Sequence, residues 1–360
     1  MKERIRSIDY LKSLAILAVV FYHIGIMKNG YLGVEIFFVV GGYLFFKTNK
    51  DKLENGEFKP FHFVLKKVMM FWPLIVIGGL ICLGIGAFYM LPDDYENLAQ
   101  SVFASNVFAN NVLQAITTKD YWNVSNIYKP LMHTWYISVL LQNYIFLSFT
   151  LWGIKKVCKK VSVKHSLIVF FLISFGLYLL PCFSQGDKFY YPWFRLFEIV
   201  IGCLIVYLPT INVNEFIKKT VIALCTLGII SILFFINVSN MLAVLIAVVL
   251  TFILLWTSES LNEIGKYNEK VHLYFTIPGR YSYDVYIWHQ MVVAFCYYFL
   301  FQEMNIYMVL QVIIVTGVAS VISVTIRKLI IKKMDKKSKF ALTILVVVIS
   351  SVCALFIYLF

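Results

Sequence analysis

Charged side chains are scarce in this chain of 360 residues: Asp, Glu, Lys and Arg together make up 14% of it. Soluble domains carry about 25% charged residues. Hydrophobic residues reach 61%, the mean hydropathy is +0.80, and many apolar runs are long. Proline and glycine are also modest in number, with 8 and 18 residues, and no low-complexity segment or repeat is evident. This composition excludes a soluble domain and predicts a polytopic membrane protein.

Cysteine is sparse and scattered, and no Cys-x-x-Cys pair occurs. This pattern argues against a disulfide framework and a zinc site, so we expect no metal. We also expect no bound cofactor. Most of the cysteines lie in apolar runs, where they are expected to pack as small hydrophobic side chains. The seven are Cys82, Cys158, Cys182, Cys203, Cys225, Cys296 and Cys353.

The long apolar runs are spaced as membrane crossings of about 20 residues each. They predict an all-α fold, a transmembrane bundle of about 10–11 helices, with residues 1–360 forming a single membrane-embedded domain. We do not expect a cleavable signal peptide, because the first run is long enough to span and has no convincing cleavage site. The expected spans are residues 8–27, 32–47, 66–90, 131–153, 165–182, 192–208, 219–236, 240–257, 281–301, 305–326 and 340–360.

Lys and Arg are distributed unevenly between the connections on the two sides. One set of connections holds 26 of the 32 residues and the other set holds four. Because basic residues are retained in the cytoplasm, this split predicts a cytoplasmic N-terminus in a cell membrane (inner or plasma). The net charge of +13 therefore reflects orientation in the membrane, and it indicates lipids as partners, not nucleic acid.

Two connections are long enough to carry structure or function. The outer connection, residues 91–130, contains a moderately apolar segment at 98–117 that predicts a re-entrant or interfacial helix. The inner segment, residues 47–67, is basic and is expected to lie on the anionic leaflet. We expect His62, within this segment, to be structural.

Ionisable side chains lie inside the first two expected spans, where a charge is costly and usually functional. Lys12 and His23 are eleven residues apart, so they share one helix face and are separated by about 16 Å. Glu35 follows a predicted turn at residues 27–31. An antiparallel hairpin would place His23 and Glu35 at similar depth, and we expect them to meet.

Three more ionisable residues, His133, Arg195 and Glu198, are expected at that same level near the outer ends of the fourth and sixth spans. Taken singly, each has a structural explanation: Arg195 and Glu198 can form an internal ion pair, and His133 can reach water at the interface. Their common depth favours a polar cavity with a function.

A histidine beside a carboxylate can act as a general base or can carry an acyl group transiently. Lys12, deeper on the same face as His23, can hold an anion at a fixed distance. A thioester donor that enters from the cytoplasm has this shape, with phosphates at one end and a reactive carbonyl at the other. Two-substrate transfer across the membrane is therefore one possible function.

Six motifs together resemble, in their order, those of the integral-membrane acyltransferase 3 family. Lysine stands at position 12 where that family has arginine, and Leu140 and Leu141 stand where acidic residues are common. The motifs are SIDYLKSLAILAVVFYH, with Lys12 and His23; GVEIFFVVGG, with Glu35; FASNVFANN; MHTWYISVLLQNY, with His133 and Trp135; FRLFEIVIG, with Arg195 and Glu198; and PGRYSYDVYIWHQ, with Arg280, Tyr286 and His289.

The resemblance implies an O-acyltransferase of surface glycans, with acetyl-CoA as the donor and a glycan or lipid-linked sugar as the acceptor. It implies that His23 and Glu35 are catalytic, and that Lys12 and Arg280 bind the donor. The single charge of Lys12 in place of a bidentate arginine implies a weaker or different donor contact. The acceptor side and its surroundings would consist of His133, Trp135, Arg195, Glu198, Tyr286 and His289.

Two other classes of function are compatible with the sequence. A transporter or flippase would use the same buried ion pairs as a gated path, although no inverted repeat is evident. A structural partner of a glycan-synthesis complex would leave His23 idle. We also expect no soluble hydrolase-like domain after the last span, so transfer would finish in the membrane domain or on a separate protein.

Overall fold

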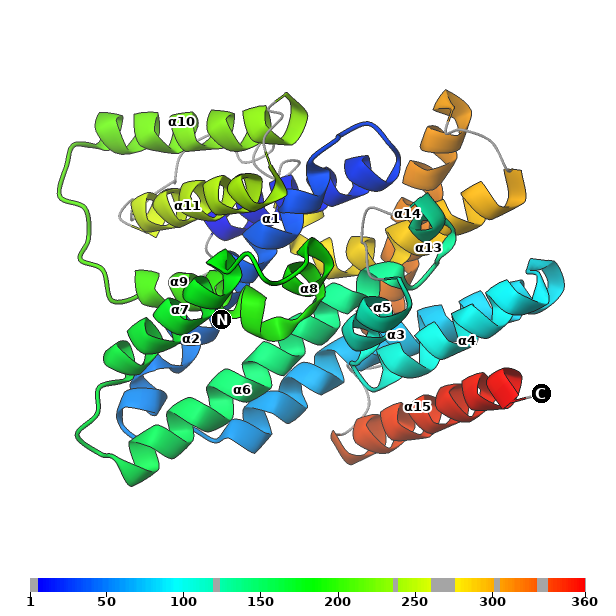
Figure 1. Cartoon of the computed structure of the whole chain (residues 1–360), viewed down its shortest axis with the longest axis horizontal. Helices are drawn as coiled ribbons and strands as arrows, with labels where there is room; N and C mark the ends of the chain where they lie inside the picture. Colours follow the sequence, from blue (N-terminus) through cyan, green and yellow to red (C-terminus); the bar gives the residue numbers. More distant parts are fainter. Residues whose placement is uncertain are drawn as a thin grey trace. The chain divides into compact units, whose positions relative to one another are not determined.

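The computed structural model describes residues 6–118, 124–235, 239–259, 276–300, 305–328 and 336–359. These residues form helices and connections without a strand, which confirms the all-α prediction. Each expected span coincides with a helix (Figure 1). Those helices are α1 (Arg6–His23), α2 (Gly33–Glu54), α3 (Pro60–Tyr89), α6 (Trp135–Val157), α7 (Val163–Leu179), α9 (Pro192–Ile205), α10 (Glu215–Phe234), α11 (Asn240–Glu259), α13 (Ser282–Leu300), α14 (Ile306–Ile326) and α15 (Lys336–Leu359).

Among the described residues, seven helical segments are long and apolar enough to cross a membrane. They correspond to α2, α3, α6, α10, α11, α14 and α15. The helices α7 and α9 have 17 and 14 residues, so they are shorter than a full crossing. Charged residues interrupt α1, and the apolar sequence of α13 includes Asp284 and His289.

The long outer connection is largely helical. Segment 98–117, expected as one helix, is the end of α4 (Pro92–Asn106) followed by α5 (Asn110–Thr117). The break is at Phe108, whose φ of 54° lies in the left-handed region that a helix cannot contain. The basic segment 47–67 is also mostly helical, since α2 continues to its C-terminus at Glu54 and α3 begins at Pro60. Short helices complete the connections: η1 (Gly30–Leu32), η2 (Val124–Tyr128), η3 (Met132–Thr134) and α8 (Gln185–Tyr190).

The described chain divides into two compact units. The first comprises residues 1–58, 150–179 and 193–282, and it contains α1, α2, α7, α9, α10 and α11. Here α10 lies beside α11, and α11 packs on α2 (Figure 1). A Cβ atom added at Gly30 or Gly33 would overlap the carbonyl oxygens of Ala18 or Ala15, so α1 and η1–α2 pack backbone to backbone as an antiparallel hairpin.

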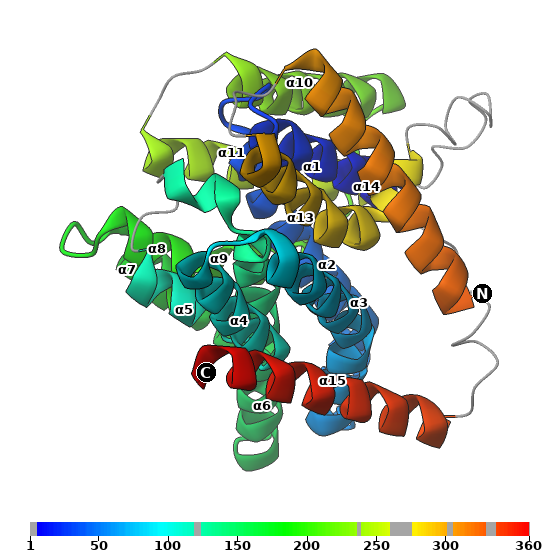
Figure 2. The same ribbon diagram turned by 90° about the vertical axis from the view of Figure 1, so that its right-hand side faces the viewer.

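The second unit comprises residues 59–149, 180–192 and 283–360. The C-terminal helix α15 packs against α4 and α3 (Figure 2). Asn106, at the end of α4, is fully buried and donates to the hydroxyls of Ser350 at 3.0 Å and Ser351 at 3.1 Å. A hydrogen-bonded amide inside an apolar contact fixes how one helix is aligned on the other.

Helices α2 and α9 of the first unit run parallel and in very close contact. A Cβ atom at Gly42 would overlap the carbonyl oxygen of Ile199, and one at Gly202 would overlap that of Val39. Only glycine permits so close an approach of two backbones. Gly42 lies seven residues, about two turns, after Glu35, and Gly202 lies seven residues after Arg195. This contact therefore brings the first turns of both helices together.

Candidate active site

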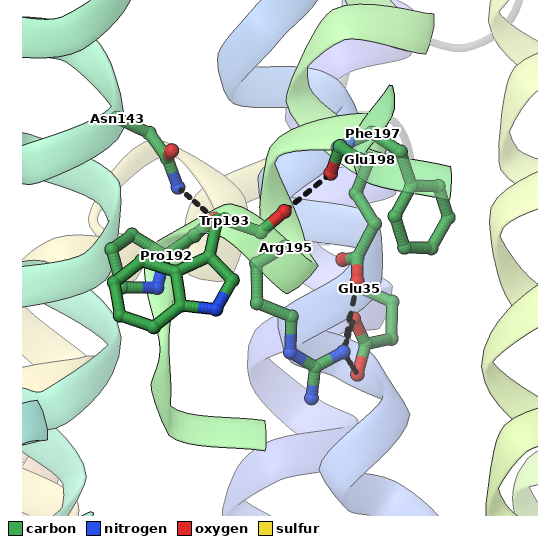
Figure 3. A network of polar contacts seen from close by, with 8 residues as sticks. Glu35, Asn143, Pro192, Trp193, Arg195, Phe197 and Glu198 are labelled. Carbon is green, nitrogen blue, oxygen red and sulfur yellow. Dashed lines mark hydrogen bonds and ion pairs between the residues drawn. The ribbon is translucent and has the colours of Figure 1, made fainter. Parts of the chain in front are cut away.

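The first polar cluster consists of two carboxyl groups and one guanidinium near the N-termini of α2 and α9. Arg195 Nη1 lies 3.1 and 3.0 Å from the two carboxyl oxygens of Glu35 and 2.8 Å from Glu198 Oε1. Figure 3 shows the guanidinium beside both carboxyl groups. Arg195 is 2% exposed and both glutamates are 0% exposed. The expected pair of Arg195 and Glu198 is present, and Glu35 joins it.

The register of the hairpin separates Glu35 from His23, the two residues that were expected to meet. Gly33 packs against Ala15 and Val19, so Glu35 lies near the level of Ala15 on α1. His23 is eight residues further along that helix, a rise of about 12 Å. The sequence prediction placed these two side chains at one depth by counting outward from the turn, and that placement is wrong.

Ser174 of α7 forms hydrogen bonds with two backbone groups in the first turns of α9. Its hydroxyl donates to the Trp193 carbonyl at 2.5 Å and accepts from the Phe197 N–H at 2.9 Å. In a regular α-helix the N–H of residue 197 would donate to the carbonyl of residue 193. The hydroxyl therefore contacts both the carbonyl and the N–H that this bond would join. This turn carries Arg195.

The two residues expected to bind the donor come from one region of the first unit. The backbone N–H of Gly279 donates to Ser13 Oγ at 2.7 Å, and a Cβ at Gly279 would overlap the Asp9 carbonyl. Gly279 thus packs on the turn of α1 that carries Lys12. Arg280 is the next residue and is exposed. Both cations therefore lie near the same end of α1, while His23 is at its other end and is 9% exposed.

A second polar cluster lies in the other unit, where three of the predicted residues meet. Tyr286 Oη donates to the backbone carbonyl of His133 at 2.6 Å. The rings of His133 and His289 have centroids 5.4 Å apart and are inclined at 72°. His289 Nδ1 must carry a hydrogen, because it lies 2.7 Å from the Tyr286 carbonyl oxygen, which can only accept. Both imidazoles are buried, at 2% and 0% exposure.

Trp135 adjoins this cluster at the start of α6. It is 1% exposed, and its ring centroid lies 4.3 Å from that of Phe189 and 5.7 Å from that of Tyr190. These contacts tie α6 to α8 within the second unit. Its ring packs against aromatic side chains, which gives Trp135 a supporting position beside His133.

A buried network of amides and hydroxyls beside His133 was not singled out by sequence reasoning. Ser105 Oγ and Thr134 Oγ1 are 2.7 Å apart, and Asn110 Nδ2 donates to the same Thr134 oxygen at 2.7 Å. Asn111 and Gln142 exchange hydrogen bonds of 3.1 and 2.9 Å. The signal was present in FASNVFANN, where four amide or hydroxyl residues occur in an otherwise apolar segment.

Comparison with known proteins identifies the family. The model of the family described as acyltransferase domain matches residues 5–328, which include the polar clusters described above. The chain belongs to this acyltransferase family. The acyltransferase is 25% identical to the O-acetyltransferase OatA of Staphylococcus aureus (strain MRSA252) over 382 aligned residues, which cover 95% of this chain and 61% of the relative. It is 23% identical to the peptidoglycan O-acetyltransferase OatA of Listeria monocytogenes serovar 1/2a over 316 residues, covering 81% of this chain and 50% of that protein.

The acyltransferase therefore spans about half to three-fifths of the length of these two relatives. No solved structure matches it. Its predicted site residues fall into groups: Lys12 with Arg280, and Glu35 with Arg195 and Glu198, both in the first unit; and His133 with Tyr286, His289 and Trp135 in the second. His23 and Lys12 both lie on α1, as expected.

Proposed function

We propose that this acyltransferase transfers an acetyl group from acetyl-CoA to a hydroxyl of a cell-surface or lipid-linked glycan, within the cell (inner or plasma) membrane. The observation that carries the proposal is the family match over residues 5–328, which includes every predicted site residue. The names of the two relatives support O-acetyl transfer, and that of the Listeria relative supports a glycan acceptor. The apolar helices support a multi-pass location in a membrane.

The donor site in this proposal is the end of α1 that carries Lys12. Lys12 and Arg280 supply two positive charges in one region, which suits the phosphates of CoA. His23 lies about 16 Å further along the helix on the same face, within reach of a long thioester arm. His23 then acts as the general base for the acceptor hydroxyl or as a transient acyl carrier.

The acceptor side in this proposal uses the cluster of His133, Tyr286 and His289, supported by Trp135. The role of Glu35 is revised, because its carboxyl group binds Arg195. Glu35 and Glu198 hold the guanidinium in place, and Arg195 orients the reacting groups. In this proposal, His23 is the residue that accepts the proton from the acceptor hydroxyl.

The test uses membranes that contain the full chain, incubated with acetyl-CoA radiolabelled in the acetyl group. We expect label in glycan with the wild type and with His62→Ala, since His62 is an exposed histidine of α3. His23→Ala should lower transfer by roughly 100-fold or more, the usual contribution of general acid–base catalysis, while the protein remains inserted. Full activity of His23→Ala would refute the role of His23, and uptake of an intact solute without acetylation would favour a transporter.

The donor assignment is tested by kinetics. Lys12→Ala should raise KM for acetyl-CoA, and Lys12→Arg should keep it low, because a guanidinium also binds phosphate. If acetyl-CoA gives no labelled product and another acyl donor does, the donor is wrong while the transferase remains. An unchanged KM in Lys12→Ala would show that Lys12 does not contact the donor.

A further inference from the structure

The triad of Glu35, Arg195 and Glu198 contains more acidic than basic groups. Two carboxyl groups, each 0% exposed, surround one guanidinium that is 2% exposed. If both acids were ionised, the triad would hold a net negative charge with no contact to water. An uncompensated buried charge is strongly disfavoured, and a titratable group in that position takes up or loses a proton instead.

The contacts within the triad also disfavour two ionised carboxylates. Glu198 Oε2, although fully buried, receives no hydrogen bond from a described donor. Both carboxyl groups contact the same nitrogen, Arg195 Nη1, so the two acids lie close to each other. Two ionised carboxylates have only acceptors and repel each other, whereas a carboxylic acid can donate to its neighbour.

Among the charged groups that act on Glu198, Arg195 is the cation. The charges that act on Glu198 are those of Glu35 and Arg195. Tyr31 of η1 and Tyr178 of α7 also interact with the triad, and both are phenols. Helix α1, packed against α2, carries the charged or titratable residues Asp9, Lys12 and His23. In the described part of the chain, the hydrogen bonds and ion pairs of both glutamates go to Arg195.

We propose that Glu35 and Glu198 share one bound proton, so that the buried triad is a neutral proton-binding site. One carboxylate balances Arg195, and the other group is a carboxylic acid at neutral pH. The two glutamates form a coupled pair, like other carboxyl pairs that share a proton. This inference concerns the charge state of the triad, so it does not depend on the acyl donor or acceptor proposed above.

The chain contains a matched control in the second unit. Asp284 is 3% exposed and pairs with Arg327, and it also accepts from Ser323 Oγ at 3.1 Å. This pair has one acid and one base, so it needs no proton. The two sites therefore differ in charge balance while both contain a buried carboxyl group.

Infrared spectroscopy of the full chain in lipid vesicles tests the proposal. The C=O stretch of a carboxylic acid is distinct from that of a carboxylate, and ¹³C labelling of glutamate alone separates Glu from Asp. We expect a protonated-glutamate band at pH 7 that shifts in ²H₂O, persists in Asp284→Asn, and is lost in Glu198→Gln and in Glu35→Gln. Absence of such a band in labelled wild type would overturn the proposal, and so would its survival in both glutamine variants.

Stability gives a second test that does not require a spectrum. Either single glutamine variant leaves one carboxylate opposite Arg195, so each should keep most of the thermal stability. The double variant, Glu35→Gln with Glu198→Gln, leaves a buried guanidinium without either carboxylate and should unfold at a much lower temperature. If one single variant were as unstable as the double variant, both acids would be needed in ionised form and the shared proton would be excluded.

Discussion

The α-carbon of Gly42 faces the backbone carbonyl of Ile199 so closely that no Cβ atom could be placed between them. This contact, repeated between Gly202 and Val39, holds α2 and α9 in the register that joins Glu35 to Arg195.

Gly42→Ala should push α2 away from α9. We expect a loss of about 1–3 kcal/mol in the free energy of unfolding, typical of overpacking a close contact, together with reduced acyl transfer. Gly176→Ala in α7 is the control, because a Cβ there meets nothing within 4 Å and alanine favours a helix. Thermal unfolding in detergent checks both, and equal stability of Gly42→Ala and wild type would contradict the close approach.

Ser174→Ala should change the first turn of α9. Without the hydroxyl, this turn loses two hydrogen bonds to α7, so the backbone that carries Arg195 is held less firmly. We expect kcat to fall and KM for the proposed donor, acetyl-CoA, to stay the same, since the proposed donor site at Lys12 is elsewhere in the first unit. Ser166→Ala in the same helix should leave both constants unchanged. A rise in KM alone would show that Ser174 does not act through Arg195.

Thr134→Val should weaken the buried network beside His133. The substitution keeps the shape of the side chain but leaves Asn110 Nδ2 and Ser105 Oγ without their shared partner. An orphaned buried group costs about 1–3 kcal/mol. Thr117→Val is the control, since Thr117 is exposed and bonds only within its own helix. Urea unfolding measures the difference, and similar midpoints for the two variants would contradict the network's role.

Lys129 in the outer connection should make stability depend on pH. Burial lowers the pKa of its ammonium below the ordinary value of 10.5, because desolvation disfavours the charged form. The folded state therefore binds fewer protons than the unfolded state, and stability should rise as pH increases from the lowered pKa toward 10.5. Lys129→Met should flatten that rise, whereas Lys160→Met, at an exposed position, should not. Unfolding temperatures of both variants, measured from pH 7 to 10, test this. An equal rise in the two variants would contradict the role of Lys129.

The length of the apolar runs predicted the helices well, because length and apolar content are properties of one segment at a time. All eleven expected spans coincide with helices, including short α9 and the polar α13. The pairing of Arg195 with Glu198 was equally predictable, since residues three apart share a helix face.

Contacts between helices were not predictable in the same way. The level of Glu35 relative to His23 depends on where Gly30 and Gly33 pack along α1. That position is set by the absence of a side chain at each of these two glycines. Counting outward from the turn gave the wrong partner. The left-handed backbone of Phe108 similarly divides one apolar segment into two helices, although phenylalanine rarely adopts that conformation.

The parallel pairing of α2 with α9 has a consequence for biosynthesis. Glu35 leaves the ribosome 160 residues before Arg195, which corresponds to roughly 8–30 s at typical rates of synthesis. During that interval the nascent α2 contains an acid whose guanidinium does not yet exist. Until then, Glu35 must either stay hydrated at the translocon or take up a proton. The final packing of α2 therefore waits until α9 has been inserted.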